Sequence, residues 1–126
     1  PTRAHADDAG LDLYSRENMV IYPHSSATFD IGVHVEIPRG YVGMIKSKSG
    51  LNVKYGLTSE GVLDCGYTGS IRVKLYNHSS EAYTVAAGDK ISQLVIMPII
   101  APELELVKDF GTETERGDNG FGSTGR

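Results

Sequence analysis

Apolar and polar residues alternate strictly over residues 27–37, where Ala27, Phe29 and Ile31 begin the apolar series. A period of two predicts a half-buried β-strand with one face toward a core. Shorter runs rich in β-branched and aromatic residues predict further strands, separated by glycine and proline turns. Many short strands joined by turns predict an all-β domain built as a sandwich, a jelly roll or a barrel. The shorter runs cover residues 41–46, 71–76, 83–85, 91–97 and 104–107.

Only one stretch favours a helix. Residues 49–55 are expected to form two turns, with the Ser49 hydroxyl as the N-terminal cap and Gly56 ending the helix. The pattern therefore predicts a β-rich domain with one short helix.

Composition and charge narrow the function classes. The chain has 126 residues, 40% of them hydrophobic, which is ordinary for one globular domain. Its net charge of −4 argues against broad binding to polynucleotides, so any phosphate must be held locally. No apolar run approaches the ~20 residues of a membrane helix. The single Cys65 suits a reducing compartment, and the four histidines lack metal-ligand spacing. We expect a soluble cytoplasmic protein, or one of the nucleus or host interior if the source is eukaryotic or viral.

The apolar content falls sharply after Lys108, with only Phe110 and Phe121 beyond it. This predicts a body over residues 1–108 and a C-terminal arm over residues 109–126. In the last eleven residues, glycines alternate with hydroxyls, two arginines and Phe121. Such a segment is either a disordered tail or a flexible arm that grasps phosphate and stacks its ring on a ligand.

Two polar stretches in the first half of the chain each allow two interpretations. Asp12 lies among three carboxylates in residues 6–15, and it either belongs to a solvated acidic face or faces Mg²⁺. Residues 46–51 place two lysines and two serines ahead of the predicted helix. They form either a phosphate cradle or a plain helix cap with surface lysines.

Two more stretches follow in the second half. Residues 61–70 resemble a hairpin that carries Asp64 and Tyr67, and these residues are either ordinary turn chemistry or a preorganised general base beside a ring. Gln93 is the one large polar residue in an apolar run. Its amide is either satisfied within the core or bonded to a phosphate or water.

Taken in order, the motifs AGLDLYS, KSGL, GVLDCGYTG, GDKISQLV and RGDNGFGSTG resemble those of the homotrimeric dUTPase family. The resemblance runs from residue 6 to residue 125 and implies a distorted jelly roll with a flexible C-terminal arm. It also implies a homotrimer whose active sites are shared between subunits. The implied reaction is Mg²⁺-dependent hydrolysis of dUTP to dUMP and pyrophosphate, by in-line attack of water on the α-phosphorus.

The resemblance also implies roles for individual residues. Asp64 would orient and deprotonate the attacking water, and Tyr67 would stack under the deoxyribose and exclude a ribose. Asp12 and Gln93 would act near Mg²⁺, partly through water. Main-chain groups of the stretch from Asp64 to Tyr67 would read uracil. The implied substrate contacts are Lys48, Ser49 and Gly50 near the phosphates, Gly61, Val62 and Leu63 before Asp64, Arg116, Ser123 and Thr124 on the γ-phosphate, Gly122 in the arm, and Phe121 on uracil.

Some positions depart from the family pattern. Lys48 stands where arginine is commoner, which replaces a bidentate fork by a point charge. Glu60 stands where a small residue is usual. The alternatives are a dCTP deaminase of similar fold, and a nucleotide-gated interaction protein with a regulatory partner, as in some phage and viral relatives. The arm motif and the stretch from Asp64 to Tyr67 favour the pyrophosphatase.

Overall fold

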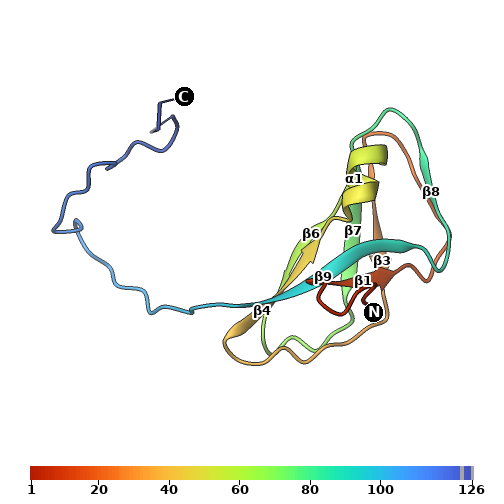
Figure 1. Ribbon diagram of the computed structural model, residues 1–126, viewed down its shortest axis with the longest axis horizontal. Helices are drawn as coiled ribbons and strands as arrows, with labels where there is room; N and C mark the ends of the chain where they lie inside the picture. Colours follow the sequence, from red (N-terminus) through yellow and green to blue (C-terminus); the bar gives the residue numbers. More distant parts are fainter. Residues whose placement is uncertain (123, 126) are drawn as a thin grey trace.

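The computed structural model describes residues 1–122 and 124–125, and its largest sheet has four antiparallel strands. The strand order is β1-β9-β4-β6, with β9 and β4 paired from Tyr41 opposite Pro98 to Lys46 opposite Gln93. Figure 1 shows these strands side by side below the helix. The four elements are β1 (Gly10–Tyr14), β4 (Tyr41–Lys46), β6 (Glu60–Leu63) and β9 (Lys90–Pro98).

Two smaller sheets close the other side of the core. The order in the three-stranded sheet is β3-β7-β5, and β2 pairs with β8. Alternate residues of β7 are buried, because the period of two turns every second side chain inward. Together the sheets bury a shared cluster that includes Leu13, Phe29 and Leu94, which confirms the all-β prediction. The elements are β2 (Met19–Ile21), β3 (Ser26–Asp30), β5 (Leu57–Thr58), β7 (Arg72–Asn77) and β8 (Tyr83–Val85).

The strand predicted over residues 27–37 is only half correct. β3 ends at Asp30, although burial still alternates from Ile31 to Ile37. Gly32 has a φ of 71°, and its N–H donates to the Asp30 carboxylate at 3.0 Å. This local turn ends the ladder. Beyond it, the segment stays tied to the chain before β7 by the bonds Ile31 N–H to Ile71 O and Ile71 N–H to Val33 O.

The helix α1 covers Ser49–Tyr55, as predicted, but its cap differs. The N-cap residue is Lys48, in an extended conformation and with no side-chain cap bond, so the prediction of Ser49 as the cap is wrong. Ser49 is instead the first helical residue and is exposed. Gly56 ends the helix with a φ of 67°, and its N–H donates to Asn52 O at 3.0 Å, as expected for a left-handed C-cap.

The segment predicted as a hairpin is a crossover between sheets. β6 pairs with β4, whereas β7 pairs with β3 and β5, so β6 and β7 lie in different sheets. The loop between them contains a tight turn, in which Tyr67 N–H donates to Asp64 O at 3.2 Å and Gly66 has a φ of 90°. The turn prediction was therefore right and the strand pairing wrong.

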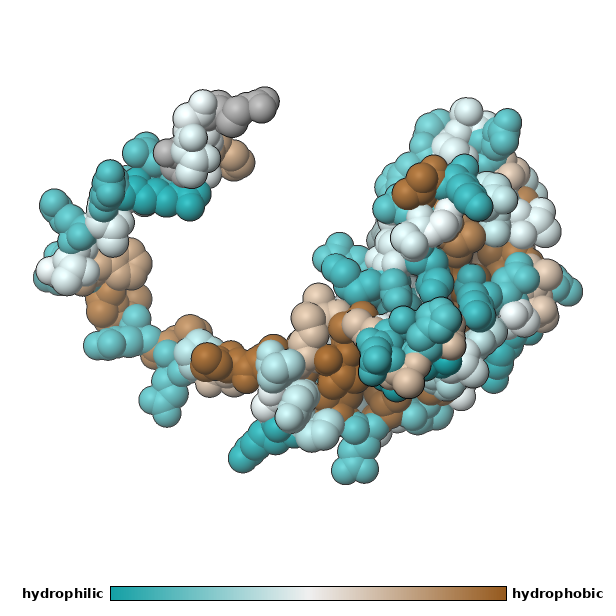
Figure 2. All heavy atoms as spheres, in the orientation of Figure 1, coloured by the Kyte–Doolittle hydropathy of each residue, from teal (hydrophilic) through white to brown (hydrophobic). Residues whose placement is uncertain are grey.

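Beyond Pro98 the chain extends away from the body (Figure 1). The strand predicted over residues 104–107 is absent from the part that the structure describes, and Leu104 and Leu106 are 97% and 101% exposed. A strand needs a neighbouring edge for its backbone groups, and this segment has left the body's sheets. Figure 2 shows hydrophobic side chains along the departing segment. The division into a body of residues 1–108 and an arm of residues 109–126 stays a prediction.

Within residues 1–122 and 124–125, the helix is far too short and too polar to cross a membrane.

Candidate active site

A row of polar residues crosses the four-stranded sheet near the start of α1. Asp12 lies opposite Gln93, Gln93 lies opposite Lys46, and Lys46 lies opposite Glu60. Directly opposed residues of antiparallel strands point to the same side, so these four share the face turned away from the core. Lys48 follows two residues after Lys46. The fold therefore brings three of the residues expected near phosphate and metal, Asp12, Lys48 and Gln93, to one end of the sheet.

The Asp12 carboxylate forms ion pairs with the ammonium groups of two lysines. Its side chain is only 6% exposed, Lys48 Nζ donates to Oδ1 at 2.5 Å, and Lys90 Nζ lies 3.4 Å from Oδ2. Burial raises the pKa of Asp12, but the hydrogen bonds and charges of Lys48 and then Lys90 outweigh it, and the pKa falls below 3.8. Asp12 is therefore ionised at neutral pH and fixes the position of Lys48.

We expect Asp12→Asn to destabilise the fold by about 1–3 kcal/mol at pH 7, because hydrogen bonds to charged groups are lost. The folded-state pKa lies below the unfolded one. The ion pairs therefore stabilise the fold above about pH 4, and this stabilisation is lost as the pH falls through the folded-state pKa. Urea unfolding of both chains, at one protein concentration and several pH values, should give a difference that is constant from pH 7 to 5 and shrinks below about pH 4. A difference unchanged at pH 3 would contradict the assignment.

Gln93 is fixed in the same region by its neighbours. Its Nε2 donates to Ser47 O at 2.9 Å, and its side chain lies against the bare backbone of Gly10. A Cβ on Gly10 would lie 1.9 Å from Gln93 Oε1, so only glycine leaves room for the amide there. The amide therefore holds the carbonyl that immediately precedes Lys48. The amide nitrogen is thus bonded within the chain, although Gln93 lies at the cavity and not in the core.

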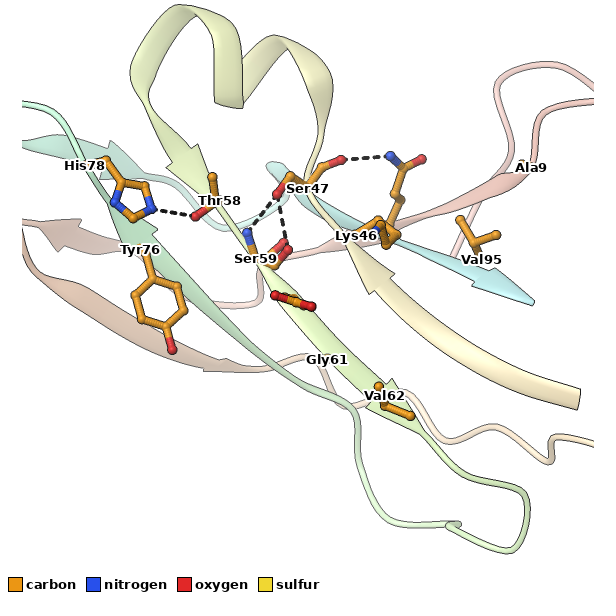
Figure 3. A pocket seen from close by; sticks show the side chains of 12 residues that line it. Ala9, Lys46, Ser47, Thr58, Ser59, Gly61, Val62, Tyr76, His78 and Val95 are labelled. Carbon is orange, nitrogen blue, oxygen red and sulfur yellow. Dashed lines mark hydrogen bonds between the residues drawn. The ribbon is translucent and has the colours of Figure 1, made fainter. Parts of the chain in front are cut away.

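A cavity of about 1110 Å³ opens on the same face (Figure 3). The cavity is lined in part by Gly61, Val62 and Gln93, which were expected near the substrate. Of the other lining residues, Lys46 and Ser47 belong to the stretch of residues 46–51 that was interpreted as a possible phosphate cradle. No chemical role was predicted for the rest, although the alternation in β7 does place Tyr76 outward. Those other lining residues are Ala9, Lys46, Ser47, Thr58, Ser59, Glu60, Tyr76, His78 and Val95.

Asp64 and Tyr67 lie on the exposed loop after β6. The Tyr67 hydroxyl donates to Ser70 O at 2.8 Å, and its ring lies across Gly69. A Cβ on Gly69 would lie 2.5 Å from the Tyr67 hydroxyl oxygen, so glycine is needed for this ring position. The loop is thus a rigid support for an exposed ring and an exposed carboxylate.

The segment after β3 buttresses this loop. The Ser70 hydroxyl donates to the Asp30 carboxylate, and His34 Nδ1 lies 2.7 Å from Thr68 O. The hydrogen bonds from Ser70 and from Gly32 N–H, with Arg16 nearby, hold the pKa of Asp30 below 3.8. These contacts were not predicted, because they depend on how residues 30–34 pass beside the loop.

In the part of the chain that the structure describes, Asp64 lies apart from the polar row along the direction of β6. Leu63 lies opposite Gly43, whereas Glu60 lies opposite Lys46 near the polar row. Asp64 follows four residues after Glu60, which corresponds to roughly 13 Å along a strand. The loop that carries Asp64 and the polar row therefore lie at opposite ends of β6.

The arm lies apart from both the loop and the polar row. Phe121, Gly122 and Thr124 are exposed, and the Arg116 guanidinium donates to Asn119 O at 2.8 Å and to Gly120 O at 3.1 Å. Ser123 lies outside the described residues. Within residues 1–122 and 124–125, no cluster of three His, Cys, Asp or Glu residues is arranged to hold a metal.

The dUTPase family model matches residues 1–125. The chain belongs to the dUTPase family. A deoxyuridine 5'-triphosphate nucleotidohydrolase of Yarrowia lipolytica is 42% identical over 127 residues, which cover 99% of this chain and 81% of the relative. The corresponding protein of Clostridium tetani is 41% identical over 129 residues, covering 100% and 88%.

Solved dUTPases share the fold. The dUTPase of Staphylococcus bacteriophage 80alpha, solved with dUPNHPP, has a TM-score of 0.93 and 34% identity, covering 100% of this chain and 91% of that one. A mutant dUTPase of phage phi11 of S. aureus, described with a structural Mg(II) ion, has a TM-score of 0.82 and 33% identity, covering 89% and 91%. The predicted family and the jelly-roll-like all-β fold are confirmed.

Proposed function

We propose that this dUTPase hydrolyses dUTP to dUMP and pyrophosphate at sites assembled from neighbouring copies of the chain. The observation that carries the proposal is the separation of Asp64 from the polar row by roughly 13 Å along β6. Both halves belong to the region that matches the dUTPase family. A neighbour's loop placed against the polar row would bring the halves together, and a homotrimer with three such contacts would form three sites.

The residues of the two halves suit phosphoryl chemistry, which needs positioning and charge neutralisation more than covalent participation by the protein. Asp64 is exposed on a rigid loop and would direct and deprotonate the attacking water. Lys48, Ser49 and Gly50, at the start of α1, would contact the phosphates. Tyr67 would lie under the deoxyribose, where its ring leaves no room for a ribose 2′-hydroxyl.

Uracil recognition involves the edge strand that leads to Asp64. Gly61, Val62 and Leu63 belong to β6, and Val62 is exposed on the face that lines the cavity. These residues would contact the substrate, and main-chain groups of residues 64–67 would read the uracil edge. A pocket that fits closely around these groups rejects both a thymine methyl and a cytosine amine.

Mg²⁺ fits this site as a partner of the nucleotide. Magnesium is commonly held by one or two carboxylates together with substrate phosphates and water, so a dedicated cage of protein ligands is not required. Asp12 supplies an ionised carboxylate beside Gln93. Because its oxygens are paired with Lys48 and Lys90, Asp12 and Gln93 would hold the ion through water. When bound, Mg²⁺ would neutralise phosphate charge.

The arm would close the site. Arg116, Ser123 and Thr124 would hold the γ-phosphate, Phe121 would stack on uracil, and Gly122 would allow close approach. The exposed apolar side chains after β9 favour a neighbouring subunit as the arm's destination, since contiguous exposed apolar surface marks interaction sites. These side chains are Ile99, Ile100, Leu104, Leu106, Val107 and Phe110.

Subunit mixing tests the shared site. Asp64→Asn damages only the loop half, and Ser49→Asp damages only the phosphate half by repelling phosphate from an exposed helical position. Each chain alone should release little pyrophosphate from dUTP. After the chains are unfolded together and refolded at equal amounts, about a quarter of the sites should combine an intact loop with an intact phosphate half. We therefore expect about a quarter of wild-type activity.

In the control, each variant is refolded alone, and the two folded proteins are then mixed. This mixture should stay inactive as long as the assemblies do not exchange subunits. If co-refolding gave no more than the sum of the two residual activities, the site would lie within one chain. The wild-type chain, assayed beside them, should release pyrophosphate far faster from dUTP than from dCTP, dTTP or UTP.

Hydrolysis is favoured over the two alternatives because the curated relatives are named nucleotidohydrolases. A dUTPase of phage 80alpha is described as controlling the transfer of virulence genes. A regulatory partner for this chain remains a proposal for a viral source. We also propose the cytoplasm, or the nucleus or host interior, as the site of action, where deoxynucleotide pools are formed.

A further inference from the structure

We propose that three serines, Ser47, Ser59 and Ser92, form a positioning network that holds the phosphate turn in place. The phosphate turn is defined here as residues 48–50, and its contact with phosphate rests on the proposed function. None of the three serine side chains was assigned above to the substrate or to the metal. The network connects the residue after β4, the residue before β6 and a residue of β9.

The network is a directed chain of hydrogen bonds. Ser92 Oγ donates to Lys46 O at 2.9 Å, so its oxygen accepts from Ser59 Oγ at 2.7 Å. Ser59 N–H donates to Ser47 Oγ at 3.0 Å, and Ser47 Oγ donates back to Ser59 O at 3.1 Å. Figure 3 shows the bonds between Ser47 and Ser59 at the edge of the cavity.

The network ends on the main chain directly before the phosphate turn. Ser92 holds the carbonyl of Lys46, and Gln93, its neighbour on β9, holds the carbonyl of Ser47. Two consecutive carbonyls are thus fixed by two consecutive residues of one strand. Ser59 lies directly before β6, which leads to the loop of Asp64. The network therefore ties the phosphate turn to both β9 and β6.

Because these hydroxyls are buried, the loss of one of their hydrogen bonds should destabilise the local structure. Ser92 is fully buried and Ser59 is 5% exposed. If one hydroxyl is removed, its partners stay buried and lose a bond that water cannot easily replace. The backbone before Lys48 would then shift to recover a partner. A small misplacement of a binding group can weaken binding and catalysis by large factors.

The test compares Ser92→Ala and Ser59→Ala with wild type. We expect the KM for dUTP, and the Kd for a non-hydrolysable imido analogue of dUTP, to rise about tenfold in each. We expect kcat to change less than about threefold, because Asp64 is carried by the separate loop. The double variant should raise the Kd by far less than the product of the single effects, because both hydroxyls belong to one chain of bonds.

Ser79→Ala is the matched control. The Ser79 hydroxyl donates to Asn77 Oδ1 at 2.8 Å and to Glu81 O at 3.0 Å, in a network near the other end of α1. It should lower Tm, because these hydrogen bonds are lost, and leave both KM and Kd within about twofold of wild type. Ser92→Cys, which preserves size and weakens the hydrogen bond, should give an intermediate Kd and keeps the test available if Ser92→Ala folds poorly.

The proposal is overturned if Ser92→Ala, Ser59→Ala and Ser92→Cys lower Tm but leave KM and Kd within twofold of wild type. Independent effects of the two alanine changes would also overturn it. Failure of the wild-type chain to bind the analogue would count against the proposed function itself, so the two outcomes are distinguishable.

Discussion

Replacing Asp64 by asparagine should lower kcat for dUTP by about 10²–10⁴-fold, the usual contribution of a general base. The carboxylate is exposed on a loop fixed by Asp30 and His34, so the isosteric amide should leave the fold unchanged. In the proposed site, binding of dUTP rests on the phosphate turn, the uracil contacts and the arm. The Kd for dUTP should therefore change little, measured by calorimetry with the inactive variant.

Glu36→Gln provides the matched control, since it removes one exposed negative charge from the segment after β3. Its kcat and KM should stay within about twofold of wild type. An Asp64→Asn enzyme with near-normal turnover would refute the assignment of the base. A large rise in Kd would show instead that Asp64 contributes mainly to binding.

Removal of residues 111–126 should leave a folded trimer that scarcely hydrolyses dUTP. The described residues of this segment are exposed and lie outside the buried core, so the core loses nothing when they are removed. The proposed site would lose Arg116 and Phe121, and with them the charge on the γ-phosphate and the cover over uracil. We expect kcat/KM to fall by about 10²-fold or more, because closure both positions the substrate and excludes water.

A chain whose arm sequence is scrambled at constant length and composition tests whether the arm acts as a specific lid or as a generic tail. It should be as inactive as the truncated chain, while size-exclusion chromatography and Tm should match wild type in both. Full activity of the truncated chain would show that the arm is an ordinary disordered tail.

Local patterns were sufficient for much of the fold. The alternation in β7 and the short β-rich runs of β4 and β8 identified strands within about one residue. The αL cap at Gly56 was predicted for a similar reason, since glycine accepts a positive φ without steric cost. The family followed from five ordered motifs, which no single stretch could have shown.

Features that depend on contacts between residues distant in sequence could not be predicted from local patterns. Gly32 ends β3 by bonding to Asp30, although the apolar alternation continues past it. Nothing in the sequence distinguishes Ser59 and Ser92 from surface serines, because their hydrogen bonds cross 33 positions. The ion pair of Lys48 with Asp12 spans 36 positions and likewise had no local signal.

The placement of the loop and the polar row at opposite ends of β6 has a genetic consequence. In the proposed trimer, a chain with a defective loop inactivates a site whose other half belongs to an intact neighbour. A cell that expresses one normal and one defective allele would therefore lose activity in mixed assemblies in proportion to subunit composition. Two alleles with defects in different halves would instead restore part of each other's activity, so inheritance patterns would reveal which half a mutation affects.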